Sequence, residues 1–125
     1  MEKKIIYTEN APEPGNYSQA IKYGDLIFVS GQTADDPETG EPVKGSVKEQ
    51  TDLILTNIEK ILQSVDSGLE KVLKVNVYLS DMEHKPEFEQ VYVEYFPQNQ
   101  PARIAMAVKG MDAGLDIEID VIAAS

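Results

Sequence analysis

The segment from Ser46 to Val65 constrains the fold of this chain more than any other. Ser46 and Glu49 have the spacing of a capping box, in which the Ser46 hydroxyl accepts from a free helix amide and Glu49 reaches back. Apolar residues then recur at helical spacing along one face: Val47, Thr51, Ile54, Leu55, Ile58, Ile61, Leu62 and Val65. Gly68 is expected to end the helix. Such a helix needs an apolar surface to cover.

Strands are predicted to provide that surface. Short β-branched or alternating segments predict strands over 3–8, 17–23, 26–30, 73–79, 103–108 and 115–123. Gly24 and Asp25 predict a hairpin turn, and the apolar run 26–30 suggests a strand that is buried on both faces. Pro86 begins a second predicted helix, which 97–101 ends. Its inner face is expected to hold Phe88, Val91, Tyr92 and either Tyr95 or Phe96.

The order of these elements predicts an α+β sandwich in a single domain, residues 1–125, with a mixed sheet and both helices on one face. The last strand alternates strictly. Leu115, Ile117, Ile119 and Val121 should lie under the helices, so that Asp116, Glu118 and Asp120 line the open face. Because tyrosine, valine and methionine side chains accompany them, we expect self-association to cover this face.

Composition excludes several kinds of chemistry. The chain has no cysteine and one histidine, His84, which excludes disulfides, a thiolate nucleophile and a His-rich metal site within one chain. The formal charge is -11 and the lysines are scattered, so nucleic acid and anionic membranes are not expected partners. No apolar run approaches a membrane span, and cytoplasmic localisation is the expectation.

Arg103 is the only arginine of the chain and stands where a predicted strand begins, after Pro101 and Ala102. A guanidinium binds a carboxylate with two parallel hydrogen bonds, so Arg103 is a candidate for holding a small organic acid. The alternative is that Arg103 pairs with one of the chain's own 22 carboxylates.

Glu118 is the candidate for acid-base chemistry. It lies between Ile117 and Ile119 in the middle of a strand, where a carboxylate is costly unless it is paired or functional. It can move a proton on or off a water, or it can pair with a basic residue of a neighbouring strand. Ser30 can donate to a substrate oxygen or satisfy a backbone group, and Tyr17 can close over a ligand or pack its ring.

Several segments together resemble the Rid (YjgF/RidA-type) family. The resemblance rests on Asn10-Ala11-Pro12, Gly15 to Ala20, Phe28-Val29-Ser30-Gly31-Gln32, Pro37 to Gly40, Val72 to Asp81, Pro101-Ala102-Arg103 and Glu118 to Ala123. It covers essentially the whole chain. It implies a chorismate-mutase-like two-layer sandwich and a homotrimer with a central barrel core and three clefts between subunits.

The resemblance also implies an activity, the hydrolysis of 2-imino and enamine acids to 2-oxo acids and ammonia (2-iminobutanoate/2-iminopropanoate deaminase), with no cofactor. Arg103 would bind the substrate carboxylate and Glu118 would position the attacking water. Tyr17, Ser30 and Gly31 would be further pocket residues, and no metal is implied.

The chain departs from the family pattern at several of these positions. Glu89 stands where the family often has an Asn, and a carboxylate there would repel an anionic ligand unless it points away. Ile104 and Ala105 replace the usual Ser or Thr and the frequent Cys, and Asn16 replaces a usual Pro. We expect these changes to affect the substrate range.

Two other functions remain open from the sequence. One is a trimer that binds a metabolite or a protein without turnover, which Glu89 favours. The other is an endoribonuclease or translation inhibitor, which the charge of -11 and the absence of a basic patch disfavour.

Overall fold

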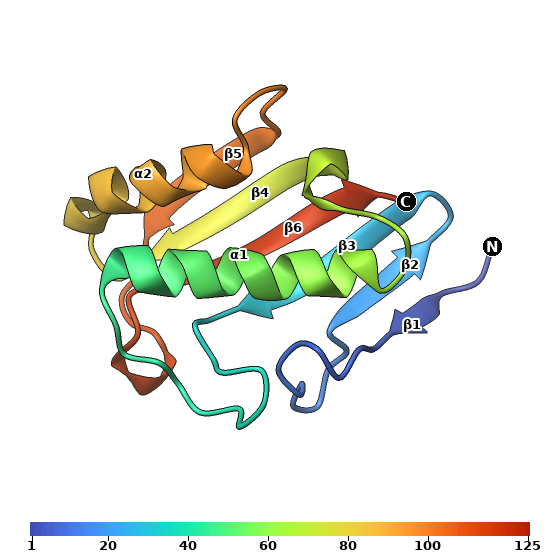
Figure 1. Ribbon diagram of the computed structural model, residues 1–125, viewed down its shortest axis with the longest axis horizontal. Coiled ribbons are helices and arrows are strands. Elements are labelled where there is room, and N and C mark those ends of the chain that lie inside the picture. The colour runs from blue at the N-terminus through green and yellow to red at the C-terminus, as the bar shows by residue number, and fades with distance from the viewer.

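The computed structural model describes residues 1–125 as one mixed six-stranded sheet with two helices on one face (Figure 1). The strands are β1 (Lys4–Ile6), β2 (Ala20–Tyr23), β3 (Leu26–Gln32), β4 (Val72–Leu79), β5 (Ala102–Ala107) and β6 (Ile117–Ala124). The helices are α1 (Val47–Gln63) and α2 (Lys85–Tyr95). The strand order is β1-β2-β3-β6-β4-β5, and only the β4–β5 pair is parallel.

Helix α1 begins with the predicted capping box. The Glu49 amide donates to Ser46 Oγ at 3.1 Å, and the Ser46 amide donates to Glu49 Oε1 at 2.9 Å. The apolar stripe is buried from Val47 to Leu62. The helix ends at Gln63, earlier than Gly68, because Asp66 adopts the left-handed backbone (φ 60°) that glycine would normally supply.

The core lies between the helices and one face of the sheet. Alternate residues of β6 and β4 point into it, and Ile117, Ile119, Val75 and Val77 are fully buried. This confirms the predicted alternation of the last strand. Helix α2 adds Phe88, Val91 and Tyr92, and Phe96 is buried just after the helix.

Asp116 does not lie on the open face, which corrects that part of the prediction. The strand begins only at Ile117, so the alternation does not extend to residue 116. The Asp116 carboxylate instead accepts hydrogen bonds from Gln50 of α1 at 3.1 Å and from Ser80 at 2.9 Å. Glu118 and Asp120 are the carboxylates that β6 places on the open face.

Two predictions about the first hairpin are also wrong. The second strand begins at Ala20 and not at Tyr17, because the buried Gln19 side chain bonds the Thr8 amide and carbonyl and the Pro12 carbonyl, which anchors the preceding loop. Strand β3 is not buried on both faces. Leu26 and Phe28 are 39% and 42% exposed, because they lie on the face that no helix covers.

The open face of the sheet carries large apolar side chains from all six strands. The register places Phe28 and Ile122 opposite each other, and Tyr78 beside Met106. The exposed members are Ile5, Tyr23, Leu26, Phe28, Ile104 and Met106. Polar side chains of β4 and β6, such as Asn76 and Asp120, lie between these apolar groups. Exposed apolar groups in this number are typical of an association surface. Neither helix has the length and apolar character needed to cross a membrane.

Candidate active site

A polar hollow of about 360 Å³ opens where β3 ends and β6 begins, beside the first loop. Its walls are Tyr17, Ser30, Gly31, Thr33, Asp112 and Glu118. A second hollow of about 320 Å³ shares Gly31 and Glu118 with it and adds Tyr78, Met111 and Asp120, among others. Glu118 and Gly31 therefore lie at the centre of a continuous depression, which four residues of the predicted site line.

The Glu118 carboxylate lies directly over Gly31. A Cβ atom at position 31 would be 2.2 Å from Glu118 Oε2, so only glycine leaves room for the carboxylate in this position. The register of β3 with β6 shifts between Val29 and Gln32, which is the signature of a bulge. Bulges redirect side chains near functional sites, and this one brings Gly31 next to Glu118.

The Glu118 carboxylate forms neither a hydrogen bond nor an ion pair with another residue of the chain. The two ion pairs present are His84–Asp116 at 3.5 Å and Arg103–Glu89 at 2.8 Å. Burial raises the pKa of Glu118, and Asp112 and Asp120 raise it further. A carboxylate with a raised pKa and no protein partner can take a proton from a bound water or return one.

Ser30 and Tyr17, two of the three hydroxyl residues that line the hollow, have different surroundings. The Ser30 hydroxyl donates to the Ser18 carbonyl at 2.6 Å, as the structural alternative for this serine predicted. Its oxygen can still accept a hydrogen bond. Tyr17 is 55% exposed and stands at the rim, where the loop that Gln19 anchors presents it.

Arg103 lies on the other side of the sheet. Its register partner is Val75, which points into the core beneath the helices. The guanidinium carbon is 4.9 Å from the ring centre of Tyr92 and 5.5 Å from that of Phe88, both on α2. Within one chain, Arg103 therefore lines neither hollow around Glu118.

Glu89 does not point away from Arg103. Arg103 Nη2 donates to Glu89 Oε2 at 2.8 Å, and this hydrogen bond lowers the pKa of Glu89. The pairing of Arg103 with a carboxylate of its own chain, considered above as an alternative, is therefore formed in the structure. The equivalent pairing considered for Glu118 is not.

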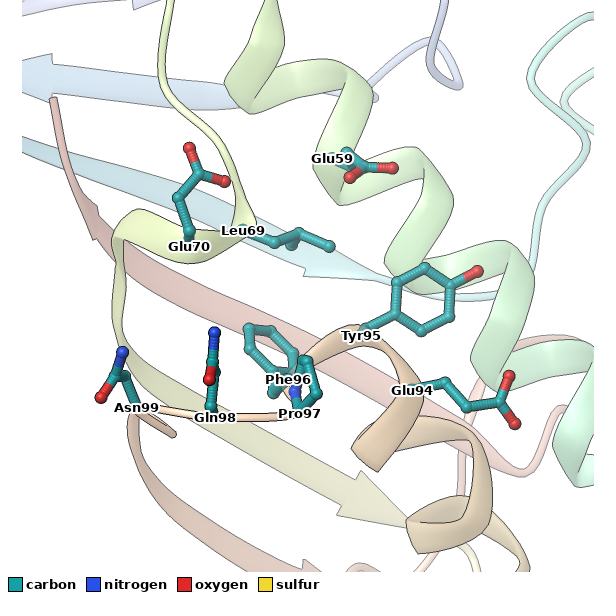
Figure 2. Close-up of a pocket in the computed structure, with 9 residues that line it drawn as sticks. All are labelled: Glu59, Leu69, Glu70, Glu94, Tyr95, Phe96, Pro97, Gln98 and Asn99. Atoms are coloured by element: carbon teal, nitrogen blue, oxygen red, sulfur yellow. The ribbon is translucent and has the colours of Figure 1, made fainter.

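Another hollow, of about 330 Å³, lies on the helix side between α1 and the segment after α2 (Figure 2). Three carboxylates, from Glu59, Glu70 and Glu94, line it together with Tyr95, Phe96 and the amides of Gln98 and Asn99. It contains no basic side chain and none of the predicted site residues. An anionic ligand has no positively charged partner there.

Sequence reasoning missed two residues of the Glu118 hollow, Thr33 and Asp112. Asp112 belongs to a short 3-10 turn, Asp112–Gly114, in which Ala113 adopts a left-handed backbone (φ 58°). Nothing in the sequence of this turn indicates that it folds back beside Glu118. Thr33 follows the bulge, and a bulge changes which residues share a face.

The sequence and the fold of this chain are similar to those of known proteins. The family model described as Endoribonuclease L-PSP matches residues 8–125. A RutC family protein of Pyrococcus horikoshii is 48% identical over 97% of this chain and 97% of its own length. The protein named Reactive Intermediate Deaminase A, chloroplastic, of Arabidopsis thaliana is 37% identical over 98% of this chain and 66% of its own length.

A crystal structure of RidA from an Antarctic Psychrobacter species superposes with a TM-score of 0.93 at 35% identity, over 98% of this chain and 99% of the other. The chain therefore belongs to the Rid/YjgF/L-PSP family, which also contains the RutC proteins. Its fold is the chorismate-mutase-like α+β fold that the resemblance implied.

Proposed function

We propose that this chain hydrolyses reactive 2-imino acids, such as 2-iminopropanoate (formed from 2-aminoacrylate) and 2-iminobutanoate, to 2-oxo acids and ammonia. Water adds to the carbon of the C=N bond, the C–N bond then breaks, and the nitrogen leaves as ammonia. The imine carbon is already electrophilic, so the protein needs to hold the substrate, orient water and move protons. This reaction requires no cofactor.

The observation that carries the proposal is the environment of Glu118. The Glu118 carboxylate has a raised pKa and forms no hydrogen bond or ion pair within the chain. It lies over Gly31, where the absence of a Cβ leaves space for it. Tyr17 and Ser30 line the same hollow. In the proposed mechanism Glu118 positions a water and accepts its proton, and the two hydroxyl residues contact the substrate.

Arg103 would bind the substrate carboxylate, and it would do so from a second copy of the chain. Arg103 and Glu118 lie on opposite sides of one sheet, so one chain cannot bring them to the same small molecule. We propose that the apolar open faces associate into a homotrimer. Each of its three clefts would then combine Tyr17, Ser30, Gly31 and Glu118 of one chain with Arg103 and Glu89 of the next.

The experiment is the release of 2-oxo acid and ammonia from freshly generated 2-aminoacrylate. Wild type should exceed the spontaneous rate, and both Arg103→Ala and Glu118→Ala should lose most of this acceleration while remaining folded and assembled. A wild type that gives no acceleration would overturn the proposal.

The Arg103–Glu89 pair favours one second candidate, a trimer that binds a metabolite without turning it over. A paired guanidinium still has free donors for a carboxylate, but it attracts anions less strongly than an unpaired one. Saturable binding of 2-oxobutanoate with no acceleration of imine hydrolysis would favour this candidate.

A further inference from the structure

The Arg103–Glu89 pair is built from two regular elements and is held on several sides. Arg103 belongs to β5 and Glu89 to α2, and their contact is 2.8 Å long. The Tyr92 and Phe88 rings lie against the guanidinium. Neither residue is on a loop, so the pair should persist when a ligand arrives.

The pair leaves the guanidinium able to take a ligand. A guanidinium has five N–H donors. The guanidinium of Arg103 makes one hydrogen bond within the chain, to Glu89. The remaining donors suffice for a bidentate contact with one carboxylate. A ligand carboxylate can therefore bind without displacing Glu89, but it then shares the guanidinium with a second negative charge.

Glu89 keeps that charge at neutral pH. The hydrogen bond from Arg103 lowers its pKa, and the positive charges of Lys85 and Arg103 contribute in the same direction. Its side chain is 44% exposed and that of Arg103 is 22% exposed, so water screens the pair only in part. The charges of Arg103 and Glu89 cancel. A ligand that has bound one carboxylate to Arg103 therefore finds no remaining positive charge on the pair for a second one.

The opposite half of the proposed cleft is also acidic. Glu118 and Asp112 line one hollow, and Asp120 lines the adjoining one. No lysine, arginine or histidine lines either of them. A ligand with a second carboxylate would find no positive partner for it, whereas an apolar or cationic substituent would meet no such penalty.

We propose that Glu89 is a specificity-determining residue that limits the site to 2-imino acids with a single carboxylate and disfavours 2-imino dicarboxylates. This inference rests on the proposed function, because it assigns the substrate class of the same site. Imino acids with neutral side chains are accepted, those with cationic side chains gain from Glu89, and those derived from acidic amino acids are rejected.

The test compares wild type with Glu89→Gln, which keeps the size and the hydrogen-bond acceptor but removes the charge. Glu94→Gln is the matched control, since it makes the same change on the same helix but lines a different hollow. Imines are generated in place from alanine, aspartate and arginine by amino-acid oxidases, and kcat/KM is obtained from the accelerated formation of the 2-oxo acids.

Glu89→Gln should raise kcat/KM for the aspartate-derived imine about tenfold relative to the alanine-derived one, as expected for removing one partly screened like charge. It should lower the value for the arginine-derived imine, and Glu94→Gln should change none of these ratios. An unchanged aspartate-to-alanine ratio in Glu89→Gln would overturn the inference while leaving the hydrolase function standing.

A binding measurement separates this inference from the proposed function. The dissociation constants of 2-oxobutanoate and 2-oxoglutarate are measured by NMR titration of the same three proteins. If wild type accelerates no imine, the proposed hydrolysis fails. The role of Glu89 would still be supported if Glu89→Gln increased the affinity for 2-oxoglutarate, relative to that for 2-oxobutanoate, about tenfold over wild type. Equal relative affinities in wild type and Glu89→Gln would contradict it.

Discussion

The charged side chains in the depression around Glu118 and at the sheet edge around Arg103 differ in pairing and in the direction of their pKa shifts. Glu118 has no hydrogen-bond partner in the chain and a raised pKa, whereas Glu89 is bonded to Arg103 and has a lowered pKa. Glu118 lies on the open face, and Arg103 packs against α2 on the helix side. One region holds an unpaired acid and the other a paired base.

In the proposed mechanism the two regions have different roles. An unpaired carboxylate with a raised pKa is suited to proton transfer, and a guanidinium stacked on two rings is suited to holding a ligand in a fixed place. Neither region alone has both parts. The comparison therefore leads to a site completed by two copies of the chain, and the predictions below test each region separately.

The largest effect is expected from Glu118→Gln, which removes the proton acceptor and preserves the shape of the side chain. Loss of a general acid-base group typically lowers turnover by about 10²- to 10⁴-fold. The measurement is kcat for hydrolysis of 2-aminoacrylate-derived imine, with sedimentation velocity as the control for assembly. Unchanged kcat would remove Glu118 from the chemistry.

Arg103→Ala should have the next largest effect. A charge-assisted hydrogen bond is worth about 1.5–3 kcal/mol, which corresponds to a loss of about 10- to 150-fold in kcat/KM. Arg103→Lys keeps the charge but not the planar fork, so it should recover only part of the activity. Full activity in Arg103→Ala would show that the carboxylate is held elsewhere.

Gly31→Ala tests the position of Glu118 without changing its chemistry. The new methyl group would lie 2.2 Å from Glu118 Oε2 and must displace the carboxylate. A misplacement of about 1 Å can cost 10²-fold, so a loss of tenfold or more in kcat is expected. A Gly31→Ala variant as active as wild type would refute the steric role of Gly31.

The smallest effect concerns stability and its dependence on pH. The folded-state pKa of Glu118 is raised, chiefly by burial, so ionising it costs more in the folded chain than in the unfolded one. Its contribution to stability is therefore lost as pH rises from the ordinary glutamate pKa through the raised value.

Glu118→Gln should accordingly raise Tm at pH 7. A stability change of about 1 kcal/mol shifts Tm by about 3–5 °C in a chain of this size, and the partial exposure of Glu118 keeps the expected rise at or below this range. The difference should shrink towards pH 4, where Glu118 of the wild type is protonated. Thermal melts of both proteins at the two pH values provide the measurement. A variant that is less stable than wild type at pH 7 would indicate that Glu118 has a structural partner.

Local patterns predicted most of the fold, because they depend on neighbours in the sequence. The capping box at Ser46, the apolar stripe of α1 and the alternation of β6 depend on periodicities of 3.6 and 2. The predictions failed where a distant contact decided the outcome. Gln19 holds the loop before β2, and Asp116 turns towards Gln50 of α1.

The residues of the candidate site could be proposed from the sequence, but their arrangement in space could not. Residue type and the family resemblance singled out Arg103, Glu118 and Glu89, but neither indicates which side of the sheet each one occupies in relation to the others. The contact between Glu89 and Arg103 depends on how α2 packs against β5, and Asp112 reaches Glu118 only through a folded turn.

The most direct test of the central claim, that one site is shared by two chains, is the mixing of two inactive variants. Arg103→Ala and Glu118→Gln are dissociated, mixed in equal amounts and reassembled, and each variant is treated alone as the control. In a closed ring with random assembly, about a quarter of the clefts would receive Arg103 from one variant and Glu118 from the other. The account predicts recovery to about a quarter of wild-type activity, and a mixture no more active than either variant alone would contradict it.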